Sequence, residues 1–371
     1  MIEFRSAVWS AGLMALACSV FCLTGAMPAR AAAGYQAPVG YQIFVTNERS
    51  GDVTVIDGGD FKVVGTIAVG KRPRGIHASP DGRTVYVALS GTPIEGPPQL
   101  DAQGNPILKK NNKSDDEDDD SKADKSADGI GMVNVAQKKL VGRISAGSDP
   151  EEFVLSKDGT RIYVSNEDIK TASVINIASG KVEHIIPVGR EPEGVNATPD
   201  GKQFYVTCET GGEVFVIDTT SYQVVGHFTV PVRPRSVDFL STGTIGFIPS
   251  ESKGQLNIID MATPKVLRSV DLPAGSRPMK VKVSVDDRRV YVSDGRAGTV
   301  SVIDTQTYEV LATVKVGTRP WGVALSPDGK YLFTANGPSN DVSVVDLATN
   351  KEVTRVKAGE SPWGLAIVKT H

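Results

Sequence analysis

Cysteine and histidine are scarce in this chain, which has 3 Cys and 4 His among 371 residues. Cys18 and Cys22 lie in an apolar N-terminal stretch, so Cys208 is the single cysteine of the remainder. One thiol cannot form an internal disulfide, and we find no Cys-x-x-Cys-His haem motif, adjacent Cys pair or His cluster for zinc. These redox and metal sites are excluded, and a hydrophobic core must stabilise the fold.

The chain also lacks a large net charge, because it has 40 basic and 43 acidic residues. Nucleic acid is therefore not an expected partner. One long apolar run occurs, from Ala7 to Met27, after Arg5 and before Ala29-Arg30-Ala31. This pattern predicts a signal peptide over residues 1–33, cleaved near Ala31 to Ala33, with an uncleaved anchor as the alternative. We therefore expect a periplasmic protein with no membrane span after cleavage.

A repeat with near-constant period fills the rest of the chain. Its marker prolines are Pro73, Pro150, Pro192, Pro234, Pro278, Pro320 and Pro362. The intervals are 42 to 44 residues except for the first, which is 77. Each unit holds four short runs of alternating apolar residues separated by turn residues, which indicates four strands. Seven such units predict an all-β, seven-bladed propeller of four-stranded antiparallel blades.

Turn chemistry divides each unit into strands A to D. Asp-Gly pairs, such as Asp81-Gly82 and Asp328-Gly329, predict tight turns between strands A and B. Strand C usually ends in an Asp suited to bonding the next turn. The chain starts its repeats at strand B, near Gln42, and ends at strand A, Gly364–Val368. We therefore predict a propeller over residues 41–369 whose ring closes when the N-terminal strands B, C and D pair with the C-terminal strand A.

Strand B and the loop after it carry a family resemblance. The runs are Phe44-Val45-Thr46-Asn47, Tyr163-Val164-Ser165-Asn166, Tyr205-Val206-Thr207-Cys208 and Tyr291-Val292-Ser293-Asp294. With the Val-Ile-Asp and Ser-Pro-Asp-Gly elements, they resemble the YVTN family of β-propeller repeats. More narrowly, the chain is similar to exported propellers associated with pyrroloquinoline quinone (PQQ)-dependent alcohol catabolism. That resemblance implies a quinoprotein dehydrogenase or an ABC transporter component as partner, and it carries over no catalytic residue.

The long first interval contains an acidic insert over residues 91–128. From Asn111 to Asp128 it has eight acids against three lysines and no aromatic residue. Such a run is solvated more readily than it packs, and we predict a disordered segment. The alternative is capture of a hard cation, calcium or a lanthanide, although the acids do not have the spacing of an EF-hand loop.

The connections from strand D to strand A should share one face with the opening of the central channel. Arginine there is suited to carboxylates, and exposed tryptophan is suited to contacts. We predict that this face binds a small acidic ligand such as PQQ, or an acidic patch of a periplasmic protein. The candidate residues are Arg72, Arg74, Arg190, Glu193, Arg233, Arg235, Arg277, Arg319, Trp321 and Trp363. The alternative is that these charges are solvated or paired between blades.

Two further function classes stay open. A propeller lactonase or hydrolase would hold a metal at the channel mouth through Glu and Asn side chains, for which the candidates are Asn47, Glu48, Asn166, Glu167, Glu209, Glu251 and Asn336. The same residues also follow from a repeat that ends strand B in Asn and an acid. A cell-surface structural or adhesion module is the third class. We favour a monomeric, non-catalytic binding protein, and we assign no catalytic residue and no metal ligand.

Overall fold

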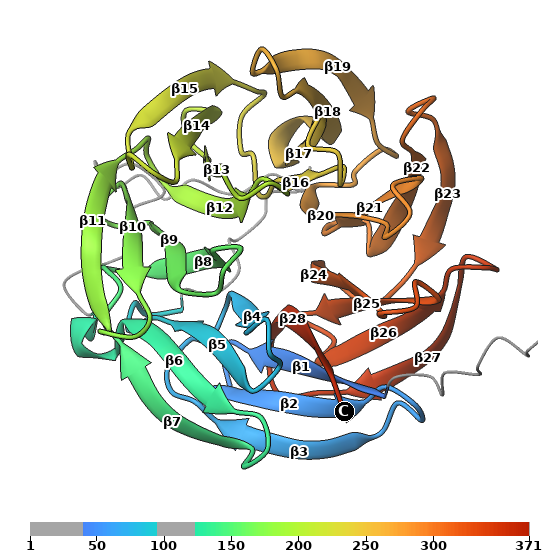
Figure 1. The fold of residues 1–371 in the computed structure, drawn as a ribbon. Coiled ribbons are helices and arrows are strands. Elements are labelled where there is room, and N and C mark those ends of the chain that lie inside the picture. The colour runs from blue at the N-terminus through green and yellow to red at the C-terminus, as the bar shows by residue number, and fades with distance from the viewer. Residues whose placement is uncertain (1–39, 95–122, 371) are drawn as a thin grey trace, which may run out of the picture. The chain divides into compact units, whose positions relative to one another are not determined.

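Seven four-stranded antiparallel sheets form the described part of the chain, arranged as blades around a common centre (Figure 1). The computed structural model describes residues 40–94 and 123–370. The predicted signal peptide and residues 95–122 of the acidic insert lie outside the described residues. Among the described residues, no helix has the length and apolar character needed to cross a membrane.

The blades are numbered along the chain, and their strands are given from the centre outward. Blade 1 consists of β28 (Pro362–Lys369), β1 (Tyr41–Asn47), β2 (Asp52–Asp57) and β3 (Val63–Ala68). Blade 2 consists of β4 (Ile76–Ala78), β5 (Thr84–Leu89), β6 (Gly129–Asn134) and β7 (Lys139–Ile144). Blade 3 consists of β8 (Pro150–Leu155), β9 (Arg161–Asn166), β10 (Thr171–Asn176) and β11 (Lys181–Pro187).

The remaining four blades have the same order. Blade 4 consists of β12 (Pro192–Ala197), β13 (Gln203–Cys208), β14 (Glu213–Asp218) and β15 (Val224–Thr229). Blade 5 consists of β16 (Asp238–Phe239), β17 (Ile245–Ser250), β18 (Gln255–Asp260) and β19 (Lys265–Asp271). Blade 6 consists of β20 (Pro278–Val283), β21 (Arg289–Asp294), β22 (Thr299–Asp304) and β23 (Val310–Lys315). Blade 7 consists of β24 (Pro320–Leu325), β25 (Tyr331–Asn336), β26 (Asp341–Asp346) and β27 (Lys351–Lys357).

Two short 3₁₀ helices, η2 (Lys125–Ala127) and η3 (Glu251–Lys253), follow the second strands of blades 2 and 5. The turns obey the expected chemistry, since Gly82 and Gly329 take the positive φ angles, 67° and 69°, that a side chain would strain. The Asp that ends strand C also has its expected role, because the Asp57 carboxylate accepts the Gly59 N–H at 2.8 Å and the Asp346 carboxylate accepts the Thr349 N–H at 2.8 Å.

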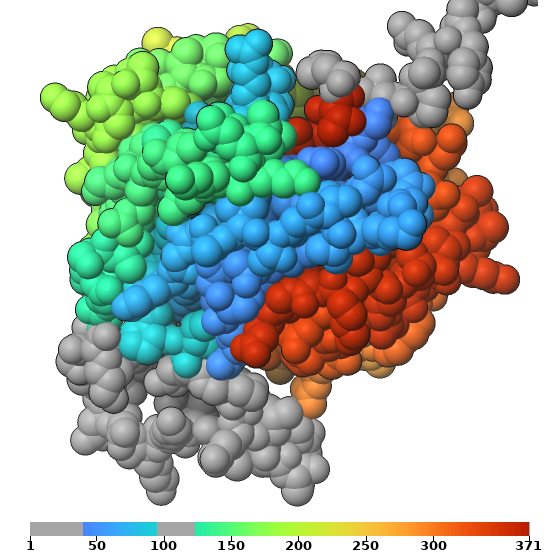
Figure 2. Space-filling view, turned by 90° about the horizontal axis from the view of Figure 1, so that it is seen from below, coloured from blue at the N-terminus to red at the C-terminus, as the bar shows by residue number. Residues whose placement is uncertain are grey.

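The two chain ends meet in blade 1, which confirms the predicted closure. β28 pairs antiparallel with β1, with Ile43 opposite Ile367 and Tyr41 opposite Lys369. In Figure 2 the blue N-terminal strands lie directly beside the red C-terminal ones. The inner strand of this blade thus comes from the opposite end of the chain, and no blade is left without its fourth strand.

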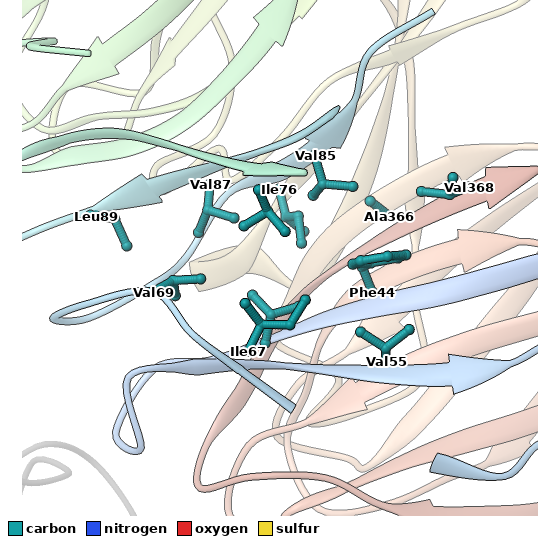
Figure 3. Packing of buried hydrophobic residues seen from close by; sticks show 12 residues of the cluster. Phe44, Val55, Ile67, Val69, Ile76, Val85, Val87, Leu89, Ala366 and Val368 are labelled. Carbon is teal, nitrogen blue, oxygen red and sulfur yellow. The ribbon is translucent and has the colours of Figure 1, made fainter. Parts of the chain in front are cut away.

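Hydrophobic packing takes place between blades rather than within one sheet. Seven buried clusters each join two neighbouring blades. Figure 3 shows the cluster between blades 1 and 2, where the buried side chains include Phe44, Val55, Ile67, Val85, Val87 and Leu89. Because each blade buries its two faces against its neighbours, the core is a continuous ring.

Hydroxyl side chains of the strand B motif hold the inner strands in place. The Thr46 hydroxyl accepts the Gly364 N–H of its own blade at 2.9 Å and donates to the Arg74 carbonyl of the next blade at 2.7 Å. Ser165 and Ser293 donate in the same way to the carbonyls of Glu193 and Trp321, each at 2.7 Å. The motif therefore fixes the backbone of residues that line the channel mouth.

Candidate functional site

The turn that leads into each inner strand has the same backbone conformation in all seven blades. The residue before the marker proline has a φ between 43° and 64°, and these residues are Arg72, Asp149, Glu191, Arg233, Arg277, Arg319 and Ser361. A left-handed conformation costs a non-glycine residue roughly 1–2 kcal/mol. None of the seven is glycine, so the fold maintains side chains at a position that glycine would occupy more easily.

The residue after each proline divides the channel mouth into two sectors. Blades 2 to 5 contribute Arg74, Glu151, Glu193 and Arg235, which we call the charged sector. Blades 6, 7 and 1 contribute Met279, Trp321 and Trp363, which we call the aromatic sector. The two indole rings are nearly parallel, with centroids 6.2 Å apart and an angle of 21° between their planes. The rings of adjacent blades are therefore neighbours.

Ion pairs neutralise one side of the charged sector. The Arg235 guanidinium lies 2.7 Å from the Glu251 carboxylate and 3.4 Å from that of Glu193, and it also pairs with Glu209. Arg233 lies 2.6 Å from Glu209 and 3.1 Å from Glu251. Burial alone would raise the pKa of Glu251, but the two guanidinium groups outweigh it and lower the pKa to about 2. Glu251 is therefore ionised and already paired.

A second network holds the other side of the charged sector. The Arg72 guanidinium lies 3.1 Å from Glu48 and 3.6 Å from Asp149, while Arg74 pairs with both Asp149 and Glu151. Asp149, Glu151 and Glu167 have carboxylate oxygens within 4.8 Å of one another, so a hard cation would find oxygen ligands here. Arg74 already supplies positive charge to two of the three, and a cation would have to displace its guanidinium.

Arg319 differs from the other arginines that precede a proline. The mouth position that follows the second strand of a blade is Glu48, Glu167, Glu209 or Glu251 in four blades, but Gly295 and Gly337 in blades 6 and 7. Among the described residues, Arg319 has no carboxylate partner, and its guanidinium lies 5.0 Å from the centroid of the Trp321 ring. Burial lowers the pKa of Arg319 below its usual value, although Glu251 acts in the opposite direction.

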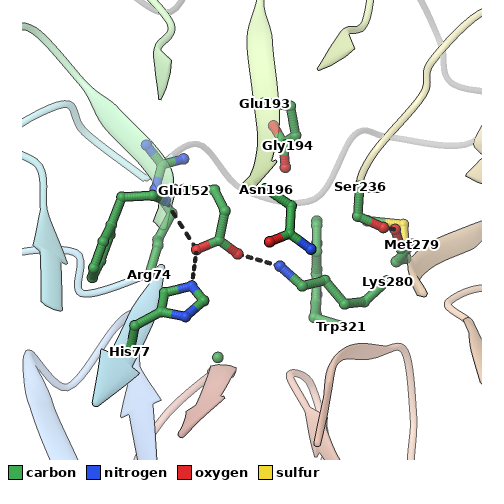
Figure 4. Close-up of polar contacts among 12 residues, drawn as sticks. Arg74, His77, Glu152, Glu193, Gly194, Asn196, Ser236, Met279, Lys280 and Trp321 are labelled. Carbon is green, nitrogen blue, oxygen red and sulfur yellow. Dashed lines mark hydrogen bonds and ion pairs between the residues drawn. The ribbon is translucent and has the colours of Figure 1, made fainter. Parts of the chain in front are cut away.

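A small pocket lies at the mouth between the two sectors. Its lining residues are Glu152, Glu193, Arg235, Met279, Lys280, Trp321, Gly322 and Trp363. Glu152 and Lys280 lie one residue deeper along β8 and β20, and their side chains form an ion pair across the channel. Figure 4 shows Glu152 between Lys280 and His77, whose Nε2 lies 3.1 Å from the carboxylate.

The ionised state of Glu152 in this deeper ion pair is strongly favoured. Burial would raise the pKa of Glu152, but the charges and hydrogen bonds of Lys280 and His77 lower it to about 2. The pair joins blade 3 to blade 6 through the centre of the ring. A ligand that enters the mouth therefore meets a charged contact one residue below the aromatic sector.

The three candidate asparagines lie inside the blades. Asn47, Asn166 and Asn336 are fully buried, and none of them lines the pocket. Their Nδ2 atoms donate to the hydroxyls of Thr54, Ser173 and Ser343, at 2.9, 2.7 and 2.9 Å. These bonds join the second strand to the third. Asp294 takes this position in blade 6, where the Ser301 hydroxyl donates to it at 2.7 Å and burial raises its pKa to about 6.

The structure brings part of the predicted set together. Glu193, Arg235, Trp321 and Trp363 line the pocket, and Arg319 lies over Trp321. Arg72, Arg74 and Arg233 are held in ion pairs, Arg277 lies 3.9 Å from Glu251, and Arg190 is exposed outside the pocket.

Sequence reasoning missed Met279, Gly295 and Gly337. An ideal Cβ on Gly295 would lie 2.9 Å from the Met279 Cγ, and one on Gly337 would lie 3.3 Å from the Trp321 Nε1. The signal was present in the sequence, because these glycines replace the glutamate that follows strand B in four other blades.

Comparisons with known families cover two separate parts of the chain. A family model described as a YNCE-like beta-propeller matches residues 254–370, and one described as a Choice-of-anchor I domain matches residues 39–191. No curated protein matches the chain in sequence.

Solved structures agree with the fold over most of the chain. Hydrazine synthase of Kuenenia stuttgartiensis is 21% identical with a TM-score of 0.68, covering 83% of this chain and 92% of that one. The periplasmic gluconolactonase PpgL of Pseudomonas aeruginosa is 19% identical with a TM-score of 0.68, covering 90% and 100%. A putative 6-phosphogluconolactonase of Bacteroides fragilis is 16% identical with a TM-score of 0.69, covering 91% and 100%. At these identities the likeness shows the propeller fold alone.

Proposed function

We propose that this chain is an exported, non-catalytic propeller that binds a small carboxylate-bearing molecule at the channel mouth. The observation that carries the proposal is Arg319, a half-buried cation in a left-handed turn that has no carboxylate partner among the described residues. A desolvated guanidinium gains most from a bidentate carboxylate. A small ligand suits this position better than a broad protein surface, because the pocket lies within the channel mouth and is lined by Trp321, the ring that Arg319 lies over.

The biological setting belongs to the same proposal. The signal sequence supports export to the periplasm, and the repeat resemblance supports a role beside PQQ-dependent alcohol oxidation, with PQQ as one suitable carboxylate ligand. A quinoprotein dehydrogenase or a transporter component would then receive or deliver that ligand. The name of the Pseudomonas aeruginosa relative, a periplasmic protein, agrees with this compartment.

A metal-dependent lactonase is the rival function, since two of the three similar structures named above carry lactonase names. In this chain the carboxylates at the mouth are paired with arginine, as Glu251 is with Arg233 and Arg235. A divalent cation would have to compete with these guanidinium groups for its ligands. The geometry therefore supports binding over metal-assisted hydrolysis.

The test is thermal unfolding of the purified protein with PQQ, with and without Arg319→Gln. A ligand at about 100 times its Kd stabilises the native state by about 2.7 kcal/mol, which raises the melting temperature. We expect the shift for the wild type and for Arg288→Gln, whose side chain is 77% exposed in a turn on the opposite face, and its loss in Arg319→Gln. An equal shift in Arg319→Gln refutes the proposed site, and calcium-dependent hydrolysis of gluconolactone favours the rival.

A further inference from the structure

An inter-blade pairing rule sets Arg319 apart. In blades 2, 5 and 6 the arginine before the proline meets the glutamate that follows the second strand of the preceding blade. These pairs are Arg72 with Glu48 at 3.1 Å, Arg233 with Glu209 at 2.6 Å, and Arg277 with Glu251 at 3.9 Å. The same rule applied to blade 7 directs Arg319 toward position 295, which is a glycine. Blade 7 therefore has the arginine of this pair, Arg319, without the glutamate that the other three arginines meet.

The surroundings of Arg319 are aromatic rather than acidic. The Trp321 ring lies 5.0 Å from its guanidinium carbon, and the Trp363 ring is stacked beside that of Trp321. The Met279 side chain lines the same pocket as these two rings. Trp363 and Met279 are 9% and 5% exposed, whereas Trp321 is half-buried. The Trp321 indole, which the Arg235 guanidinium also approaches at 5.8 Å from the ring centroid, is thus the more exposed of the two rings. Gly337 allows this indole to lie close to the loop, because a Cβ there would meet its Nε1 at 3.3 Å.

We propose that the mouth is selective for planar aromatic carboxylates: the ligand carboxylate pairs with Arg319 as glutamate does with the equivalent arginines, while its ring packs against the Trp321 indole. This inference rests on the proposed function and specifies its ligand class. Stacked or edge-on aromatic pairs add about 0.5–1.5 kcal/mol beyond the area that they bury. A charge-assisted hydrogen bond to a carboxylate is about twice as strong as a neutral one. A ligand with both groups should therefore bind more tightly than one with either alone.

The test uses the tryptophans themselves as the reporter. The chain has 3 Trp, of which Trp9 lies outside the described residues and the other two form the aromatic sector. Fluorescence is titrated with 2-naphthoate, with its neutral counterpart 2-naphthamide, and with gluconate as a non-aromatic carboxylate, and binding is confirmed by calorimetry. We expect 2-naphthoate to bind at least about tenfold more tightly than either of the others, which corresponds to about 1.4 kcal/mol.

Two substitutions separate the roles of charge and ring. Arg319→Gln should weaken 2-naphthoate about tenfold and leave 2-naphthamide unchanged, while Trp321→Leu should weaken both aromatic probes. Arg277→Gln is the matched control, because Arg277 has the same turn position in blade 6. The Arg277 guanidinium is already paired with Glu251, so this variant should change the Kd for 2-naphthoate less than about threefold. Equal binding of 2-naphthoate and 2-naphthamide overturns this inference.

The two proposals fail in different ways. If gluconate binds through Arg319 as tightly as 2-naphthoate, the mouth is a carboxylate site and the aromatic selectivity is wrong. If neither carboxylate binds and Arg319→Gln changes nothing, both proposals are wrong. A naphthoate signal that persists in Trp321→Leu with full affinity places the ligand elsewhere and also overturns the inference.

Discussion

The two sectors of the channel mouth are built by the same turn and use it in opposite ways. In the charged sector each guanidinium meets carboxylates of neighbouring loops, as Arg235 does with Glu193, Glu209 and Glu251. In the aromatic sector Arg319 meets the face of Trp321 instead. The sectors differ in the residue after the proline, and blades 6 and 7 also have glycine where four other blades have glutamate after the second strand.

The comparison shows that arginines at equivalent positions of the loops between strands D and A need not form a single binding site. A buried ion pair adds little net stability, but a buried charge that loses its partner is strongly destabilising. The charged sector is therefore a structural joint between blades 2 to 5. A cation that lacks a carboxylate is the part of the repeat that is available to a ligand.

We expect the largest effect from a deletion that removes part of the aromatic sector together with the strand that closes the ring. Deletion of residues 362–371 removes Trp363 and the whole of β28, the inner strand of blade 1. The edge of β1 and the clusters that contain Ala366, Val368 and Leu365 would then be exposed. We expect cooperative loss of the fold, measured by circular dichroism and thermal unfolding. An unchanged melting temperature would contradict the closure of the ring.

The next prediction compares the two sectors directly by removing one arginine from each. Arg235→Ala leaves Glu209 and Glu251 buried without their main partner, and we expect the free energy of unfolding to fall by about 3–5 kcal/mol. Arg319→Ala removes a guanidinium that has no carboxylate partner among the described residues, and we expect a change within about 0.5 kcal/mol. Urea unfolding measures both. Equal losses in the two variants would show that the sectors do not differ in their charge pairing.

The fold could be predicted from the sequence because each level of it repeats. Proline spacing gave the number of blades, Asp-Gly turns gave the strand order, and the mismatched chain ends gave the closure through β1 and β28. The repeat did not reveal which arginines are paired. That outcome depends on contacts between loops of neighbouring blades, such as Arg233 with Glu209, which lie 24 residues apart in the chain.

The asparagines illustrate the same limit. The sequence placed Asn47, Asn166 and Asn336 next to the mouth, but not the direction of their side chains. Each side chain turns into the blade and bonds the third strand, as Asn336 does with Ser343. Strand alternation would have indicated this if the partner, a Ser or Thr seven residues later, had been read together with the Asn.

The smallest expected effect concerns Asp294, which occupies the asparagine position of blade 6 directly before Gly295. Its Oδ1 is buried without a hydrogen-bond partner, and burial raises its pKa to about 6. Because the folded-state pKa lies above the unfolded one, this residue stabilises the fold at low pH, and that stability is lost as the pH rises from about 4 through about 6. Asp294→Asn should therefore raise the free energy of unfolding at neutral pH by roughly 1–3 kcal/mol.

The reverse change in blade 7 is the matched control for this prediction. Asn336→Asp would place a second carboxylate beside Asp341, whose Oδ1 now lies 2.8 Å from the Asn336 Nδ2, and we expect destabilisation at neutral pH. Urea unfolding at several pH values measures both variants. The gain of Asp294→Asn over the wild type should grow between about pH 4 and pH 6 and then level off. A gain that stays the same at every pH would show that Asp294 titrates normally in the folded state.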